Sequence, residues 1–254
     1  MKDQIITFGT ALMFLTRLPV GRFCSPDAQV LSDSSRYFPA VGALVGCLLA
    51  LSLVLLSNIL PIPVVVFLTL VLGIRITGAF HEDGLADVAD SAGAFDIDKK
   101  LDIMRDSRVG TYGALALMLL VLGKFVLLSE LLAIDLIVCV VALVAAHILS
   151  RWSSVFLMAT APYARPEAAN KVVAEGVTMA RLIEATLISI LLMLPLWWLS
   201  SPAIFALFPI AWLTAFLSVK RFKRAFGGIT GDCLGATNQI VEIAILLSVL
   251  AYLQ

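Results

Sequence analysis

Residues 81–112 read HEDGLADVADSAGAFDIDKKLDIMRDSRVGTY, and this acidic stretch separates two long apolar segments. Eight of the chain's eighteen acidic residues lie in it: Glu82, Asp83, Asp87, Asp90, Asp96, Asp98, Asp102 and Asp106. Four basic residues accompany them: Lys99, Lys100, Arg105 and Arg108. So many carboxylates beside an apolar segment need a reason, and a hard divalent cation, which prefers oxygen ligands, is the first to consider.

The composition indicates a membrane protein. The 254 residues are 61% hydrophobic and 14% charged, with a mean hydropathy of +1.02, whereas soluble domains carry about 25% charged residues. We therefore predict an all-α fold, a polytopic membrane helical bundle that forms a single integral-membrane domain over residues 1–254. The net charge is zero, so nothing suggests a nucleic-acid partner. The four cysteines lack zinc-site spacing and give no support for a disulfide framework.

The length leaves room for about six or seven transmembrane helices of roughly 20 residues each. Apolar segments occur at 38–58, 63–80, 111–130, 136–158, 182–200, 203–219 and 236–253. The N-terminal apolar segment, residues 5–18, is too short to span comfortably, which favours a short interfacial or re-entrant helix. Gly42 and Gly46 form a GxxxG pair, which we interpret as a helix-packing feature only.

Charge predicts the orientation. Alternating the connections across the membrane places 17–37, 81–110, 160–181 and 220–235 on one side, and these contain nearly every Lys and Arg outside the spans. The opposite connections, at 58–63, 130–135 and 200–203, contain none. By the positive-inside rule the first set is cytoplasmic. The acidic stretch and the other motif-bearing connections are therefore expected on the cytoplasmic face.

Three acids in the stretch share one helix face. Asp83, Asp87 and Asp90 follow the spacing i, i+4, i+7, and unpaired like charges at this spacing destabilise a helix. A cation among them would relieve that repulsion, and Mg²⁺ commonly combines one or two carboxylates with substrate phosphates. The alternative is a solvated amphipathic loop whose acids merely repel one another. That alternative accounts better for Asp96 and Asp98, an expected cap and a solvent residue.

A second short helix is predicted over 97–106, with Asp96 as its N-cap. Residues 91–93 (Ser-Ala-Gly) supply a bend that would let Asp106 converge on the first three acids as a fourth metal ligand. Arg105 and Arg108 flank Asp106, and guanidinium groups there suit a phosphate ester. The next span opens with Gly110 and Gly113, at a helix N-terminus that can hold an anion.

Two basic side chains near the stretch have open roles. His81 is either a satisfied interfacial residue or a general base beside Glu82 and Asp83. Arg75 lies two helical turns before Glu82, on the same helix face. We expect it to balance the acids' charge, with a phosphate contact as the alternative.

A glycine-rich segment, GGITGDCLGATNQIVE at 227–242, is the second informative region. Its glycines, Gly228 and Gly231 among them, leave backbone N–H groups free to face an anion around Asp232. Asn238 and Glu242 follow inside the last apolar span, where a carboxylate is functional or paired. His147 and Arg151 also stand at i, i+4 and indicate either a polar cavity or structural pairing.

Together these motifs resemble one known family. FLTRLP (14–19), RYFPAVGALVG (36–46), FHEDGLADVAD (80–90), IMRDSRVGTYG (103–113), Arg151-Trp152 and GGITGDCLGATNQIVEIA (227–244) resemble cobalamin synthase, also called adenosylcobinamide-GDP ribazoletransferase. The resemblance covers the whole chain in order, and the HxDGLxDxxD and DSRxGxxG motifs are its most specific parts. Glu82 stands where relatives often carry an apolar or other residue, so its role stays open.

The resemblance implies a Mg²⁺-dependent, multi-pass enzyme of the bacterial inner membrane with a cytoplasmic active site. It would join adenosylcobinamide-GDP to α-ribazole or its 5′-phosphate and release GMP. Asp83, Asp87 and Asp90 match the family's acidic motif, and Asp106 and Arg108 match its DSR. We expect His81 or a free carboxylate, Asp83 or Asp87, to act as base. Arg105, Gly228, Gly231, Asp232 and Asn238 would bind the substrate's phosphates.

Two other functions were weighed against this one. A CDP-alcohol phosphotransferase also sets spaced aspartates at the membrane edge, but it carries an Ala-Arg pair soon after the DG, where this chain has Leu-Ala-Asp. A divalent-cation transporter would need several ionisable groups deep within its spans, and here the acids cluster at one edge. Membrane lipid is an expected partner, and homo-oligomer formation stays open.

Overall fold

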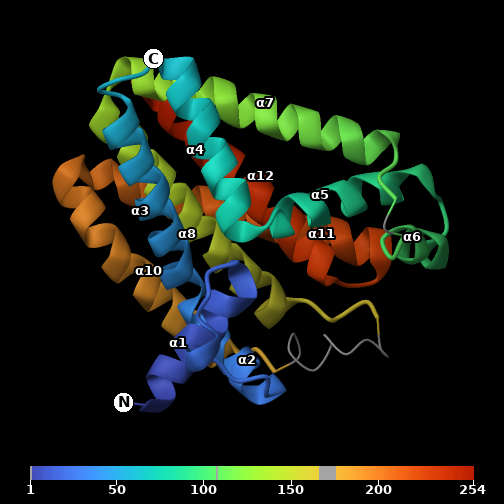
Figure 1. The fold of residues 1–254 in the computed structure, drawn as a ribbon. Helices are drawn as coiled ribbons and strands as arrows, with labels where there is room; N and C mark the ends of the chain where they lie inside the picture. Colours follow the sequence, from blue (N-terminus) through green and yellow to red (C-terminus); the bar gives the residue numbers. More distant parts are fainter. Residues whose placement is uncertain (1, 107, 166–175) are drawn as a thin grey trace.

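The computed structural model describes residues 2–106, 108–165 and 176–254, and the regular structure in those residues is helical (Figure 1). The α-helices are α1 (Lys2–Leu15), α2 (Ala28–Ser34), α3 (Phe38–Leu56), α4 (Ile62–Thr77), α5 (Phe80–Asp90), α6 (Ile97–Ile103), α7 (Thr111–Ile134), α8 (Leu136–Thr160), α10 (Met179–Leu199), α11 (Leu207–Phe226) and α12 (Gly231–Leu253). The predicted all-α fold is confirmed. Ser107 and 166–175, in the middle of the connection predicted over 160–181, lie outside the described residues.

The expected number of spans is also confirmed. Six helices in the described residues are long and apolar enough to cross a membrane, and a seventh span results if α4 and α5 count as one bent pair. Helix α1, which runs over 14 residues, is short for a span, as expected. The chain is therefore a polytopic membrane protein.

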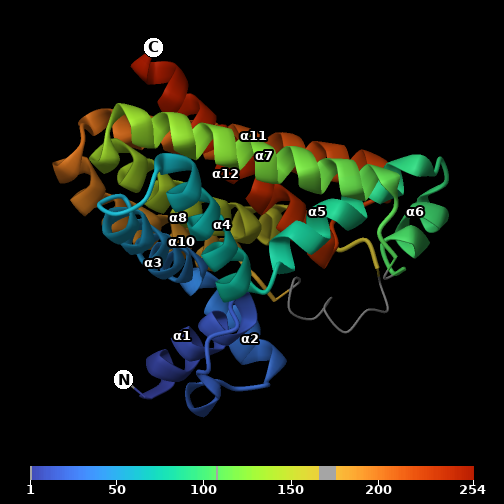
Figure 2. The same cartoon turned by 45° about the horizontal axis from the view of Figure 1, so that its top comes forward.

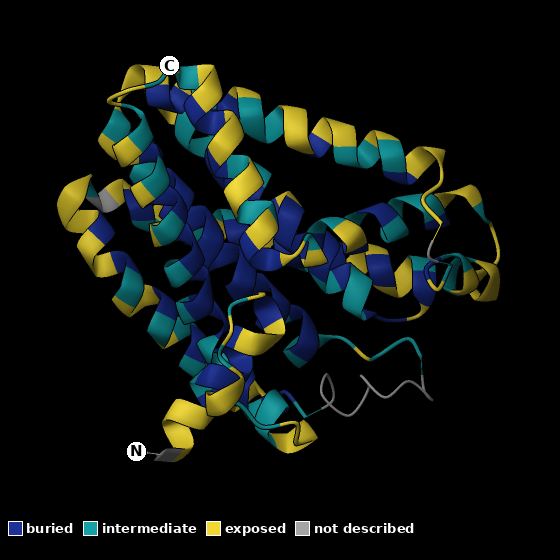
Figure 3. Cartoon of the chain, in the orientation of Figure 1, coloured by how far each residue is buried: buried dark blue, intermediate teal, exposed yellow. Residues whose placement is uncertain are grey.

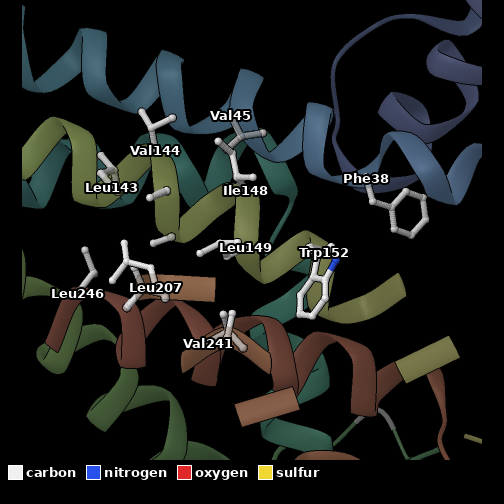
Figure 4. Packing of buried hydrophobic residues seen from close by; sticks show 14 of the residues in the cluster. Phe38, Val45, Leu143, Val144, Ile148, Leu149, Trp152, Leu207, Val241 and Leu246 are labelled. Atoms are coloured by element: carbon white, nitrogen blue, oxygen red, sulfur yellow. The ribbon is translucent and has the colours of Figure 1, made fainter. Parts of the chain in front are cut away.

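Helix α8 is the centre of the bundle. Of its apolar window, 78% is buried inside the protein, the largest share among the candidate spans. Helix α3 packs closely on it, because a Cβ at Gly42 would stand 2.2 Å from the carbonyl oxygen of His147 and one at Gly46 would stand 2.9 Å from Cα of Val144. Figure 4 shows Val45 beside Val144 and Ile148 in this contact. The GxxxG pair therefore serves packing, as predicted.

The outer faces of the bundle remain apolar. On α7, Leu119 and Leu122 are exposed, and on α10 Leu187 and Leu191 are exposed, and Figure 3 shows exposed residues along both helices. An apolar surface of this extent on helices of membrane-spanning length fits contact with lipid.

Two predicted boundaries at the C-terminal end were wrong. The connection predicted over 220–235 is mostly helical, since α11 continues to Phe226 and α12 begins at Gly231. The basic residues of this segment project from the last turns of α11 while Phe222 and Phe226 are buried, so an amphipathic helix end was read as a loop. Thr230 then caps α12 by accepting a hydrogen bond from the Cys233 N–H at 3.4 Å.

The second predicted span, 63–80, was also wrong at its end. Helix α4 stops at Thr77, and Gly78 (φ 68°) and Ala79 (φ 59°) both take the left-handed conformation. The chain turns by 89° there before α5 begins. Arg75 and Glu82 therefore lie on different helices, and the shared face expected for them does not exist. In both views α5 leads away from α3 and α10 toward α6 (Figures 1 and 2).

Candidate active site

Helix α5 carries the acidic motif and lies against the start of α12. A Cβ at Gly84 would stand 2.7 Å from the carbonyl oxygen and 2.9 Å from Cα of Asp232. One at Gly235 would stand 3.0 Å from the carbonyl oxygen of His81. Glycine at both positions lets the two backbones touch, and this contact brings the acidic and glycine-rich motifs together. Because α5 turns away from α4 and is too short to cross a bilayer, we treat it as outside the membrane-spanning helices.

A pocket of about 180 Å³ opens beside this contact. Helix α5 contributes His81 and Asp83, and the start of α12 contributes Gly231 and Asp232. Apolar side chains from the N-terminal part of the chain, Phe14 and Phe38 among them, complete the wall together with Tyr163. A mostly apolar wall with a few convergent polar groups is the usual form of a small-molecule site.

The carboxylates of this region repel one another. The pKa of Asp87 is raised to about 7, because burial removes water from its carboxylate and because Asp232, Asp83 and Asp90 add negative charge. Arg165 acts in the opposite direction on Asp87. Its Nη2 lies 3.8 Å from Oδ2 of Asp232. The region is thus short of positive charge, which fits a site for a cation.

Asp90 accepts hydrogen bonds from the backbone at the N-terminus of α7. Its Oδ2 accepts a hydrogen bond from the Gly110 N–H at 2.7 Å, and its Oδ1 accepts one from the Gly113 N–H at 2.8 Å. A Cβ at Gly110 or Gly113 would come within 2.5 Å of these oxygens. The anion site expected at this helix N-terminus therefore holds the chain's own Asp90.

Asp106 does not join the other acids in a group that could hold a metal ion, as far as the described residues show. Helix α6 begins after its predicted cap, since Asp96 accepts a hydrogen bond from the Lys99 N–H at 3.1 Å, but it ends at Ile103 rather than at 106. Asp106 follows in a turn, where Arg108 Nε donates to its Oδ1 at 3.0 Å, and this pairing lowers the pKa of Asp106 to about 2. Arg105 lies 3.9 Å from Asp102 with 61% of its side chain exposed.

The predicted phosphate-binding residues of the glycine-rich segment fall into two groups. Gly231 and Asp232 line the pocket. Gly228 instead packs on the chain, because a Cβ there would stand 2.5 Å from the carbonyl oxygen of Pro162. Asn238 is buried inside α12, where its Nδ2 donates to the carbonyl of Leu234 at 2.9 Å and contacts Ser154.

His81 is 2% exposed, and its Nδ1 has no hydrogen-bond partner among the described residues. Burial, followed by the charge of Arg151, holds the pKa of His81 well below its ordinary value. The imidazole is therefore neutral at neutral pH, and its Nδ1 is buried without a partner among the described residues.

Glu242 is paired, as a carboxylate inside a span requires. Arg151 contacts its Oε1, and Lys124 Nζ lies 2.5 Å from its Oε2. His147 Nδ1 lies 3.3 Å from the carboxylate. Glu82 lines the same small cavity as these side chains, which places it toward the cationic cluster and away from the pocket that holds Asp83.

Sequence reasoning missed two residues here. Lys124 is one of them: a lone cation within a span needs a carboxylate, but Glu130, Glu184 and Glu242 all lie in apolar segments, and the sequence does not choose among them. Arg165 belongs to the segment 163–165 that begins the connection after α8, where the sequence suggests a cover for the site but no partner for the arginine. Its nearness to Asp232 arises from tertiary contacts, and no spacing in the sequence reports it.

Among the described residues, no group of three or more His, Cys, Asp or Glu side chains is close enough to hold a metal ion by itself. The donor set still suits magnesium, because Mg²⁺ usually takes one or two carboxylates and completes its coordination with substrate phosphates and water. Asp83 and Asp232 line the pocket, and the charges of both act on the neighbouring Asp87.

The fold and the pocket define a class: a polytopic, all-helical membrane protein with a carboxylate-lined site at the start of its last helix. Comparison with known proteins makes this specific. A family described as Cobalamin-5-phosphate synthase matches residues 7–251. The chain belongs to that family and is a transferase of cobalamin synthesis, which leaves the CDP-alcohol phosphotransferase and transporter alternatives without support.

The curated relatives are similar over nearly their whole length. An adenosylcobinamide-GDP ribazoletransferase of Shewanella frigidimarina is 41% identical over 98% of this chain and 95% of its own. Those of Shewanella woodyi and Vibrio cholerae are 37% and 36% identical, over 99% and 100% of this chain and 98% and 97% of theirs. No solved structure matches the chain.

Proposed function

We propose that this protein transfers the adenosylcobinamide phosphate group from adenosylcobinamide-GDP to α-ribazole or its 5′-phosphate and releases GMP. The observation that carries the proposal is the backbone contact between Gly84 of α5 and Asp232 of α12, which joins the two motifs of the family at one pocket. The relatives' printed name supplies the donor, adenosylcobinamide-GDP, and a ribazole acceptor.

Magnesium is part of the proposal. We assign Asp83 and Asp87 as its carboxylate ligands, with Asp232 opposite them, because their mutual repulsion is relieved by a cation. Bound there, the ion would neutralise charge on the transferred phosphoryl group and on the leaving GMP. Asp90 and Asp106 match the family motifs, but the backbone of α7 and the guanidinium of Arg108 engage their oxygens. We therefore give them positioning roles.

The chain's own groups suit a direct in-line displacement. The acceptor hydroxyl oxygen attacks the phosphorus attached to the cobinamide side, the bond from that phosphorus to the GMP oxygen breaks, and the hydroxyl proton passes to the protein. Because Asp87 is assigned to the metal, the neutral imidazole of His81, whose Nδ1 has no partner among the described residues, is the group suited to receive it. The apolar wall around Phe14 and Phe38 limits water at this point.

We place the protein in the bacterial inner membrane with the pocket facing the cytoplasm. The turn at 57–61, the α7–α8 turn and the C-terminus lie together at one end of the bundle (Figure 1), and these segments contain no Lys or Arg. Among the described residues, the connections that hold lysines and arginines, such as 17–37 and 97–106, lie away from that end (Figure 1). This distribution favours a cytoplasmic pocket by the positive-inside rule.

The test is turnover by the purified protein in detergent or vesicles. With adenosylcobinamide-GDP, α-ribazole and Mg²⁺, we expect stoichiometric GMP and cobalamin product, and no product after chelation by EDTA. Asp83→Asn should abolish turnover while the protein still inserts in the membrane. A phosphorylated protein trapped from the nucleotide donor alone would contradict direct displacement. A fully active Asp83→Asn variant would show that Asp83 is not a required magnesium ligand.

A further inference from the structure

Arg165 is a half-buried arginine beside Asp232, one of the carboxylates that line the pocket. Only 14% of its side chain is exposed. It lies 3.8 Å from Asp232 and its charge acts on both Asp232 and Asp87. By contrast, the side chain of Arg105 is 61% exposed and that of Arg108 is 86% exposed, and each is paired with an acid of its own segment.

The glycine-rich segment holds Arg165 in this place. Ile229 N–H donates to the Pro162 carbonyl at 2.9 Å, and Ala164 N–H donates to the Ile229 carbonyl at 2.8 Å. This pair of bonds forms a parallel bridge between Tyr163 and Ile229. Gly228 permits it, since a side chain there would strike the 162–164 backbone. The segment that carries Arg165 is thus fixed to the loop directly before Asp232.

The donors of Arg165 are largely unused. An arginine has five N–H donors in a planar fork, and Arg165 makes one hydrogen bond among the described residues, from Nη2 to the Leu101 carbonyl at 3.1 Å. Its Nε is buried without a partner, and 3.8 Å to Asp232 is longer than a hydrogen bond. A buried donor without an acceptor is costly, so these N–H groups point to an anionic ligand.

We propose that Arg165, from its place beside Asp232, binds the diphosphate of the nucleotide donor. The inference rests on the proposed function, because that function supplies a diphosphate to this pocket. A guanidinium fork matches two phosphate oxygens at once. It would stabilise charge on the bridging and terminal oxygens as the bond to GMP breaks. The acids alone cannot do this, since they bind phosphate only through a cation.

The experiment measures binding and turnover separately. The binding probe is GDP with Mg²⁺, titrated onto the purified full-length protein, and the variants are Arg165→Ala and Arg165→Lys. We expect Arg165→Ala to weaken GDP binding by about 10- to 100-fold and Arg165→Lys, which keeps the charge but not the fork, to fall between it and the native protein. Arg22→Ala, at an exposed arginine of the α1–α2 connection, is the control and should bind as the native protein does.

Turnover gives a readout that a merely structural residue would not move. Added guanidinium ion should restore part of the activity of Arg165→Ala and none to Asp83→Asn. If Arg165→Ala does not fold, the Arg165→Lys variant provides the test. GDP binding equal to that of the native protein would show that the guanidinium fork does not bind the diphosphate. GDP binding unchanged in Arg165→Ala, or no GDP binding by the native protein, also overturns the assignment.

The two proposals fail in different ways. If GDP binding depends on Arg165 but no ribazole transfer occurs, the proposed function falls and the phosphate-binding role of Arg165 stands. If transfer occurs and neither binding nor turnover responds to Arg165→Ala, the function stands and the role of Arg165 falls.

Discussion

Gly84→Ala tests the contact on which the site depends. Alanine is the better helix former by about 0.5–1 kcal/mol inside a helix, so α5 alone would gain from the change. The new Cβ would, however, stand 2.7 Å from the carbonyl oxygen and 2.9 Å from Cα of Asp232. Both are backbone atoms, so no side-chain rotation can relieve the overlap.

The magnitude follows from these distances. Reaching an ordinary contact of 3.4 Å requires α5 and α12 to separate by about 0.7 Å. Overpacking of this kind costs about 1–3 kcal/mol. The helix-propensity gain of about 0.5–1 kcal/mol partly offsets this cost, so the loss of stability should be at most about 2.5 kcal/mol. A displacement approaching 1 Å at reacting groups costs about 100-fold in rate, so we expect kcat/KM to fall by about 10- to 100-fold.

The assay compares Gly84→Ala with Gly123→Ala in the same detergent. Gly123 lies within α7, where a Cβ would meet Ile243 Cδ1 at 3.4 Å, an ordinary contact. Thermal unfolding and GMP release are measured on both. We expect Gly123→Ala to keep its activity. Full activity in Gly84→Ala would show that the close approach of α5 to α12 does not set the geometry of the site.

Three further outcomes are expected. Asp90→Ala removes the acceptor for the Gly110 and Gly113 N–H groups, so the protein should lose about 0.5–2 kcal/mol of stability. This loss is measured as a lower unfolding temperature, and an unchanged unfolding temperature contradicts the capping role. Glu242→Gln leaves Arg151 and Lys124 buried without their carboxylate, which should lower the stability of the folded protein by about 3–5 kcal/mol. Less folded protein should then be recovered from membranes. Normal recovery would argue against a buried ion pair. The raised pKa of Asp87 gives a pH dependence, because below about pH 7 its carboxylate is protonated and Mg²⁺ must displace that proton. The Mg²⁺ concentration for half-maximal activity should therefore rise about 10-fold from pH 8 to pH 6. This rise should vanish in an Asp87 variant that retains turnover.

The sequence predicted the helices well where hydrophobicity decides. The spans starting near 38, 111 and 136 agree with α3, α7 and α8, because a continuous apolar run of this length has one stable form in a bilayer. The prediction from sequence failed where polar residues extend a helix, as at the end of α11. It also failed at Gly78, where a left-handed turn divides what reads as one apolar segment.

The motifs likewise indicated candidate site residues but not their partners. The local spacing of Asp83 and Asp87 is enough to place both on α5, and an acid within a span, Glu242, must be paired. Which cation pairs with Glu242, and that Asp90 caps α7, depends on where helices far apart in sequence meet. The position of Arg165 depends on the same packing, since it is set by backbone bonds to Ile229 and by the absence of a side chain at Gly228. Composition and periodicity thus determined the membrane bundle and its acidic edge. Close packing of α5 on α12 through glycines decided how the site is assembled, because such a contact depends on the three-dimensional fold and no local sequence pattern encodes it.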